Sequence, residues 1–223
     1  MMAGLFITFD GLEGSGKSTQ IQRLKEWLEQ AGHEVVATRE PGGTDNAETL
    51  RNLLVSGDTA AWSPVSECLI MNAARSDHLE RLIRPALAEG KIVLCDRFMD
   101  STRAYQGGGG KLPMADILAI ERSVVGETVP DVTFLFDLDP AIGLGRAGKR
   151  NAGHDNSGHG EGGQASEDRF ERKGPEYHAA VRDVFRQIAT DEPDRCILID
   201  AALPIDSVTL ALHKALQSRG IPG

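Results

Sequence analysis

One stretch constrains the fold of this chain more than any other: Gly-Leu-Glu-Gly-Ser-Gly-Lys-Ser-Thr at positions 11–19. An apolar run at 5–9 precedes it, and apolar residues at helical spacing follow from Lys17 onward. A strand, a loop with G-x-x-x-x-G-K-[ST] spacing and a helix, in that order, are typical of a phosphate-binding loop. The alternative is a glycine-rich turn before an ordinary helix, but it leaves the lysine and serine in register unexplained. The sequence therefore predicts that the chain binds a nucleoside triphosphate.

The chemistry of phosphate binding explains this spacing. Glycines at 11, 14 and 16 let the backbone bend and approach phosphate oxygens, so that successive N–H groups point into one concavity at the start of the helix. Lys17 is expected to reach the β- and γ-phosphates, and the Ser18 hydroxyl to ligate Mg²⁺. The residues predicted to bind the nucleotide are Gly11, Leu12, Glu13, Gly14, Ser15, Gly16, Lys17, Ser18 and Thr19.

The composition of the chain limits which kinds of molecule it can bind. The chain has 223 residues, 40% of them hydrophobic, and a formal net charge of −9, which predicts a globular protein and argues against duplex nucleic acid as a partner. An anionic substrate must then be held by local arginines and lysines. The three cysteines form no C-x-x-C pair, and no apolar run has transmembrane length. Because the first strand begins almost at once, we expect no signal peptide, no membrane contact and a cytoplasmic location.

Five apolar runs alternate with helical patterns. Strands are expected at 5–9, 34–38, 92–95, 132–138 and 196–200. Helices are expected at about 17–31, 47–54, 64–88, 114–125, from 140, and at 175–189 and 205–218. Pro85 is expected to kink or break the third helix, and the glycine run at 107–110 indicates a loop. The pattern predicts an α/β fold: a P-loop NTPase fold, with a five-stranded parallel sheet, helices on both faces and one domain over 1–223. Ligands of such sheets bind at the carboxyl ends of the strands.

Two further motifs follow predicted strands. Asp96 and Arg97 come directly after the third strand, where an acidic residue commonly holds Mg²⁺ and an arginine can clamp a phosphate. A structural ion pair is the alternative. Arg39, Glu40 and Pro41 follow the second strand in the same way, although Pro-Gly-Gly also fits a plain turn.

The composition changes sharply at 151–164, which is rich in glycine and has no large apolar residue. We expect a mobile lid at about 146–173, because basic residues flank this stretch on both sides. Arg146 and Arg150 are four apart and would share one face of a helix. A tolerated surface insertion is the alternative. His154 and His159 match half of a zinc motif and are interpreted as incidental, since the cysteine half is missing.

The long helix carries Arg75 among small residues, where it could hydrogen-bond a nucleobase or simply be an arginine with a buried stem. Tyr105 and Gln106 follow Asp96 closely enough to line the same cleft. The chain lacks the Asn-Lys-x-Asp guanine motif and the His-Arg-Asp set of protein kinases.

These stretches together resemble the bacterial thymidylate kinase family over nearly the whole chain. The matching segments are 9–19, 38–44, 167–171, and 96–98 together with Ser101, Ala104, Tyr105, Gln106 and Gly107. The resemblance implies that ATP phosphorylates dTMP to dTDP with Mg²⁺, in a cytosolic homodimer. It also implies a substrate pocket formed by Glu13, Glu40, Pro41, Met71, Arg75, Arg97, Thr102, Tyr105 and Gln106, and a metal site at Ser18 and Asp96.

Within that pocket the resemblance assigns roles. Glu13 faces the sugar side, Arg97 the acceptor phosphate, Arg75 and Thr102 the thymine. Tyr105 crowds the 2′ position, and Gln106 belongs to the same wall.

One branch of the family has arginine where this chain has Gly14, and the other is thought to supply a catalytic arginine from the lid. Lys17, Arg97, Arg150 and Arg146 are therefore the predicted catalytic cations, with Arg150 ahead of Arg146.

The sequence departs from the family at Met71, where relatives often have a phenylalanine that stacks on thymine, and in a longer, more glycine-rich lid. Two other functions stay open. A deoxynucleoside kinase would need Glu40 as a general base. A nucleotide-dependent switch would bind a protein partner without phosphoryl transfer.

Overall fold

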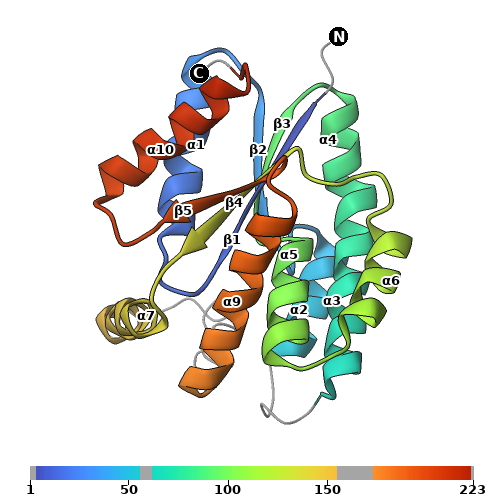
Figure 1. The fold of residues 1–223 in the computed structure, drawn as a ribbon. Coiled ribbons are helices and arrows are strands. Elements are labelled where there is room, and N and C mark those ends of the chain that lie inside the picture. Colours follow the sequence, from blue (N-terminus) through green and yellow to red (C-terminus); the bar gives the residue numbers. More distant parts are fainter. Residues whose placement is uncertain (1–3, 56–61, 155–172, 222–223) are drawn as a thin grey trace.

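The fold is a five-stranded parallel sheet, seen in a computed structural model that describes residues 4–55, 62–154 and 173–221 (Figure 1). The strands lie in the order β2-β3-β1-β4-β5. The fold class predicted from the sequence is confirmed, and each predicted strand ends within two residues of the observed one. The strands are β1 (Leu5–Gly11), β2 (Val35–Arg39), β3 (Ile92–Asp96), β4 (Val132–Asp137) and β5 (Cys196–Asp200).

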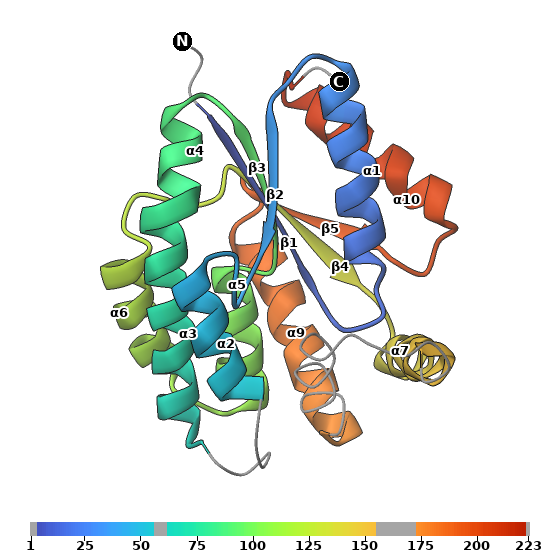
Figure 2. The same ribbon diagram turned by 180° about the vertical axis from the view of Figure 1, so that it is seen from behind.

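Helices cover both faces of the sheet, and the views from front and back agree on their placement (Figures 1 and 2). Helices α1 (Lys17–Gln30) and α10 (Ile205–Ser218) lie on one face, and most of the remaining helices lie on the other. These are α2 (Asp45–Val55), α3 (Pro64–His78), α4 (Arg84–Ala88), α5 (Met99–Thr102), α6 (Met114–Val124) and α9 (Pro175–Asp191), with the π-helical segments η1 (Leu79–Ile83) and η2 (Arg103–Gly109). Helix α7 (Pro140–His154) lies beyond the carboxyl end of β4.

The sheet is apolar on both faces because both are covered. Phe9 and Phe134 pack in the core beneath α1 and α10, with ring centroids 5.6 Å apart and the ring planes tilted by 42°. On the opposite face Phe6 meets Phe98 at 5.0 Å in a T-shaped contact. Alternate residues of β1 therefore anchor the two layers of helices.

The register of the sheet decides what its carboxyl edge displays. Phe9 pairs with Asp96, and Asp96 pairs with Arg39. The segments that follow β1, β3 and β2 thus begin side by side at one edge.

Within the described residues, no helix combines the length and apolarity needed to cross a membrane.

Of the kink or break predicted at Pro85, the break is wrong, because the helix continues through the proline. Segment η1 precedes the proline with π-helical geometry, and the Arg84 N–H donates to the Leu79 carbonyl. A π-helical turn inserts an extra residue, so the helix tolerates the missing N–H of the proline.

The loop predicted at 107–110 is also wrong in large part, because η2 continues through Gly109. The glycines allow a close helix–helix approach. A methyl group at Gly109 would lie 2.3 Å from the Tyr177 ring, and one at Gly108 2.9 Å from the Ala180 carbonyl oxygen. Packing against α9 has overridden local propensity, and it holds Tyr105 and Gln106 in place.

Residues 151–154, predicted as the start of a mobile loop, belong to α7, which runs through His154. The rest of the predicted lid, 155–172, lies outside the described residues.

Replacing Gly108 with alanine should destabilise the fold, because the new methyl would lie 2.7 Å from Val184 and crowd α9. We expect the free energy of unfolding to fall by about 1–3 kcal/mol in urea denaturation. Gly148→Ala is the control, since its methyl would meet no atom within 4 Å. That variant should be neutral or gain about 0.5–1 kcal/mol. Equal stability of the two variants would contradict the packing argument.

Candidate active site

A single cleft opens at the carboxyl edge of the sheet and gathers most of the residues singled out in the sequence. Its walls come from the loop after β1, the turn after β2, helices α2 and α3, and the segment after β3. The lining residues are Glu13, Gly14, Ser15, Gly16, Lys17, Ser18, Thr19, Arg39, Glu40, Pro41, Arg51, Leu54, Met71, Arg75, Asp96, Arg97, Phe98, Ser101, Thr102, Tyr105 and Gln106.

The glycine loop has the backbone that its sequence predicts. Gly11, Gly14 and Gly16 all have positive φ, at 139°, 67° and 88°. Helix α1 starts at Lys17, and no side chain caps its first N–H groups. Those groups and the positive end of the helix dipole are directed at the cleft, which suits an anion.

Lys17 is buried in this loop. Its ammonium donates to the carbonyl oxygens of Leu12 (2.9 Å) and Gly11 (3.2 Å). Burial and the nearby positive charge of Arg97 lower the pKa of Lys17 to about 8. Gly11 and Leu12 do not line the cleft themselves, but their carbonyls hold the lysine within it.

Ser18 and Asp96 meet across the cleft floor. The Ser18 hydroxyl donates to Asp96 Oδ2 at 3.1 Å, while the other carboxylate oxygen, Oδ1, is buried with no hydrogen-bond partner. A carboxylate with a free buried oxygen beside a hydroxyl fits a hard cation such as Mg²⁺, which prefers oxygen ligands and keeps several waters or phosphate oxygens. No group of three or more His, Cys, Asp or Glu side chains suited to a metal occurs in the described parts of the chain. These two residues therefore fit a metal bound partly by its nucleotide.

Arg97 is fixed by an acidic and an aromatic partner. Its Nη2 donates to Glu13 Oε1 at 2.9 Å and its Nη1 to the Tyr105 hydroxyl at 3.1 Å, while the guanidinium lies 5.0 Å from the Tyr105 ring centroid. The Tyr105 hydroxyl also donates to Glu13, at 2.8 Å. Burial alone would raise the pKa of Glu13, but the charges of Arg97 and Lys17 outweigh it and hold that pKa below its usual value. The backbone φ of Arg97 is +67°, a conformation that costs of order 1–3 kcal/mol in a non-glycine residue.

A second arginine of the cleft, Arg75, is more deeply buried than Arg97. Arg75 Nε donates to Glu40 Oε2 at 2.7 Å, and Nη2 donates to Thr102 Oγ1 at 3.1 Å. Both charged side chains are at most 4% exposed. Met71, one turn earlier on α3, lines the cleft on the same side as Arg75.

Gln106 and Pro41 also line the cleft, and each is hydrogen-bonded to a neighbouring side chain. Gln106 donates to Glu67 at 2.7 Å, and the Pro41 carbonyl accepts from Arg51 Nη1 at 2.7 Å.

Several residues near the cleft were missed from sequence. Arg51 is buried on α2, the helix that follows the 38–44 signature. Asp10, just before the glycine loop, is fully buried, and its Oδ2 has no hydrogen-bond partner. Burial and the charge of Asp100 raise the pKa of Asp10 to about 6. Leu54 was also missed, whereas Arg39, Phe98 and Ser101 lie in motifs noted from the sequence but were not predicted as site residues.

Gly14 has a steric neighbour that the sequence did not reveal. A Cβ at this position would lie 2.2 Å from the carbonyl oxygen of Gly143 on α7. A Cβ at Gly143 would in turn lie 2.5 Å from the Glu13 carbonyl oxygen. The two glycines let α7 touch the phosphate loop, and no arginine fits at position 14 unless α7 moves.

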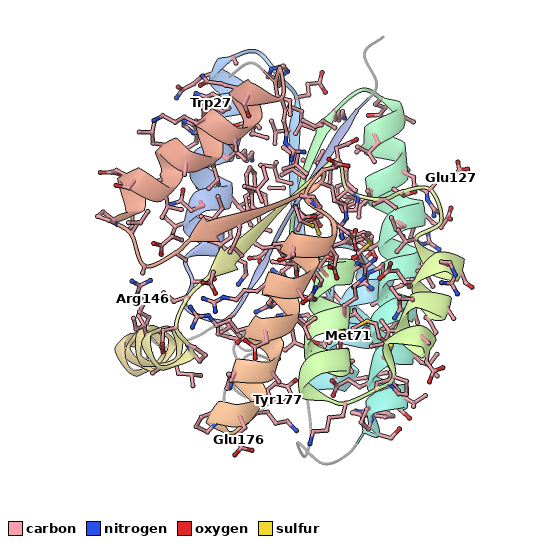
Figure 3. All side chains as sticks on the ribbon, viewed as in Figure 1. Trp27, Met71, Glu127, Arg146, Glu176 and Tyr177 are labelled. Carbon is pink, nitrogen blue, oxygen red and sulfur yellow. The ribbon has the colours of Figure 1, made fainter. Side chains whose placement is uncertain are left out.

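Both predicted lid arginines, Arg146 and Arg150, belong to α7. Arg146 lies on α7, is not part of the cleft lining, and donates from Nη1 to the Ala201 carbonyl at 3.2 Å. Met71 and Arg146 lie on opposite sides of α9 in Figure 3. In this structure the Ala201 carbonyl holds the Arg146 guanidinium, and the role of Arg146 as a lid cation that reaches the phosphates stays a prediction. The side chain of Arg150 lies outside the described residues.

Comparisons with known proteins agree with one another. The family model of thymidylate kinase matches residues 9–211. The thymidylate kinase of Caulobacter vibrioides is 51% identical over 98% of this chain and 99% of its own length. That of Afipia carboxidovorans is 45% identical over 97% of this chain and 90% of its own length. The crystal structure of thymidylate kinase from Ehrlichia chaffeensis superposes with a TM-score of 0.75 at 35% identity, covering 96% of this chain and 99% of that one.

The contact between α7 and the phosphate loop generates a prediction. Gly143→Ala should displace the Glu13 carbonyl, since its methyl would lie 2.5 Å from that oxygen. We expect kcat/KM for the nucleotide donor to fall by roughly 10–100-fold, because small displacements of binding groups cost this much. Gly145→Ala on the same helix is the matched control, since its methyl would meet nothing within 4 Å, and it should leave the kinetics unchanged. Wild-type kinetics in Gly143→Ala would show that the contact is dispensable.

Proposed function

The chain belongs to the thymidylate kinase family, and from this premise we propose how its cleft carries out the family's reaction. The protein is an ATP-dependent nucleoside monophosphate kinase that transfers the γ-phosphoryl group of ATP to dTMP, giving dTDP and ADP. One observation carries the mechanistic proposal: the phosphate loop, the partly buried Arg97 and the buried Arg75 line the same cleft.

The donor side consists of the loop N–H groups and Lys17, which we propose bind the ATP phosphates. Lys17 is already within the loop and can exchange its bonds to Leu12 and Gly11 carbonyls for phosphate oxygens. Ser18 and Asp96 would hold Mg²⁺ next to it. When bound, the ion would neutralise part of the phosphate charge.

The acceptor side is organised by Arg97. We propose that its guanidinium binds the dTMP phosphate, while Glu13 and Tyr105 hold it in one orientation. The phosphate oxygen of dTMP attacks the γ-phosphorus of ATP, the bond to the bridging oxygen breaks, and ADP leaves. The attacking oxygen is already anionic, so no general base is required.

The thymine and sugar are proposed to fill the deeper part of the cleft. Arg75, held by Glu40, and Thr102 would contact the base. Met71 would pack on its ring in place of the phenylalanine common in relatives, and Tyr105 would exclude a 2′-hydroxyl. Pro41 and Gln106 would close the pocket.

The geometry argues against a deoxynucleoside kinase. That reaction needs a carboxylate base for a sugar hydroxyl, and the candidate was Glu40. Both oxygens of Glu40 are engaged, one by Arg75 and the other by His78, and the side chain is 4% exposed. The family match also disfavours a switch protein without transfer.

We also propose that the protein is a cytoplasmic homodimer, as the family resemblance implies. Apolar side chains are exposed together on α2 and α3, which pack against each other: Leu53, Val65 and Leu69 are each about half exposed, at 48–51%. Such a face suits contact with a second copy of the chain.

The acceptor preference tests the function directly. ADP production with dTMP, dUMP, thymidine, AMP and gluconate should be highest with dTMP. Preference for thymidine would contradict the proposed acceptor and revive the deoxynucleoside kinase.

The lid arginine can be identified by a matched pair of variants. We propose Arg150 as the cation that stabilises charge in the transition state, because Gly14 leaves no room for one in the phosphate loop. Arg150→Ala should lower kcat by ~10³-fold with little change in KM. Arg146→Ala should have a much smaller effect, since Arg146 bonds the Ala201 carbonyl instead of lining the cleft. A change in KM alone for Arg150→Ala would make the lid a binding device only.

A further inference from the structure

A fully buried histidine lies directly behind the predicted base-binding arginine. His78 ends helix α3, one turn after Arg75, and is 0% exposed. Its Nδ1 lies 3.1 Å from Glu40 Oε1, and its Nε2 lies 2.7 Å from Thr38 Oγ1. The other oxygen of Glu40 accepts from Arg75 at 2.7 Å. One carboxylate is therefore shared between an arginine that faces the cleft and a histidine that does not.

The hydrogen-bond partners define the role of each ring nitrogen. Glu40 is paired with the permanently charged Arg75, so its carboxylate is ionised and can only accept hydrogen bonds. Nδ1 must therefore carry a proton and donate to Glu40. In the neutral ring Nε2 then accepts from the Thr38 hydroxyl. Because both ring nitrogens are hydrogen-bonded, the imidazole has one orientation, and its Nδ1 donor fixes the position of Glu40 Oε1.

The surrounding backbone is shaped to fit this ring. Gly43 has φ of +89°, and a Cβ there would lie 2.5 Å from both His78 Nε2 and Thr38 Oγ1. The stretch 38–44 therefore contributes a hydroxyl that bonds the ring, a carboxylate that accepts from it, and a glycine that leaves room for it. Position 43 is therefore a glycine because it must leave room for the histidine ring, and not only because the chain turns there.

The histidine also prevents a costly arrangement of Glu40. Without it, Oε1 would be a buried carboxylate oxygen with no partner, and the carboxylate would be free to rotate about its bond to Arg75. A buried acceptor without a partner is strongly unfavourable. Rotation would redirect the guanidinium, whose Nη2 also bonds Thr102 at 3.1 Å.

We propose that His78 is a positioning residue for the acceptor nucleotide: it acts through Glu40 to aim Arg75 into the cleft, and Thr38 fixes its ring. This rests on the proposed function of Arg75 at the thymine. His78 touches neither nucleotide, so its loss should weaken dTMP binding while leaving ATP binding unchanged.

Two isosteric substitutions separate the two ends of the ring. In His78→Asn the side-chain amide occupies the place of Nδ1 and keeps a donor to Glu40. In His78→Gln the amide reaches the place of Nε2, so it keeps a partner for Thr38 and loses the donor to Glu40. We expect the KM and the calorimetric Kd for dTMP to rise ~10-fold in His78→Gln and no more than about threefold in His78→Asn, with kcat and the KM for ATP nearly unchanged in both.

Thr38→Val is the second test, because it removes the hydroxyl that bonds His78 Nε2 and keeps the shape of the side chain. It should raise the Kd for dTMP severalfold even if a His78 variant fails to fold. Equal Kd values for dTMP in wild type, His78→Gln and Thr38→Val would overturn the proposal. Parallel losses in dTMP binding, ATP binding and melting temperature would also overturn it, since they indicate general structural support. Failure of the wild-type enzyme to bind or phosphorylate dTMP would refute the proposed function itself, whereas a functional wild type with unaffected variants refutes only the role of His78.

Discussion

The register of three parallel strands is the constraint on which the active site depends. Because Phe9, Asp96 and Arg39 stand side by side, the phosphate loop, the Arg97 segment and the Glu40 turn all start at one edge. A slip of one residue in β3 would turn its buried side chains toward the opposite layer and displace Asp96 from Ser18. The apolar side chains of β1, Phe6 and Phe9, resist such a slip because each packs in a different layer. The chemistry at the edge is thus fixed by hydrophobic packing in the middle of the sheet.

One partly buried and one buried ion pair then orient the arginines at this edge. Arg97 is paired with Glu13, and Arg75 with Glu40. Removing one partner of a buried pair typically costs about 3–5 kcal/mol, although a pair as a whole adds little stability. Such pairs therefore specify orientation more than they stabilise the fold. They also explain how a chain with a net charge of −9 can bind anionic nucleotides, since Arg97 and Arg75 both line the cleft and each is oriented there by a carboxylate.

Much of this arrangement could be predicted from sequence because the signals are local. The strands are short apolar runs, the phosphate loop has a fixed spacing, and residues that follow strands must gather at one edge. The failures have tertiary causes. The glycines of η2 look like a loop until Tyr177 and α9 pack on them, and Pro85 looks like a break until η1 absorbs its missing N–H. The sequence around His78 gave no signal, because the contact that matters is with the carboxylate of Glu40, thirty-eight positions earlier in the chain.

The same distinction between local and tertiary signals explains the meaning of Gly14. From sequence, its glycine marks a place where some relatives have arginine. In the structure the reason is steric, because the carbonyl of Gly143 occupies the space that a side chain would need, and Gly143 is itself a glycine for the reciprocal reason. A helix that touches the phosphate loop this closely excludes a cation from the loop, but it also brings the residues that follow on α7 into a fixed relation with the phosphates. One backbone contact, between Gly14 and Gly143, is therefore consistent with two features of the sequence. Position 14 has no arginine, and basic residues lie farther along α7.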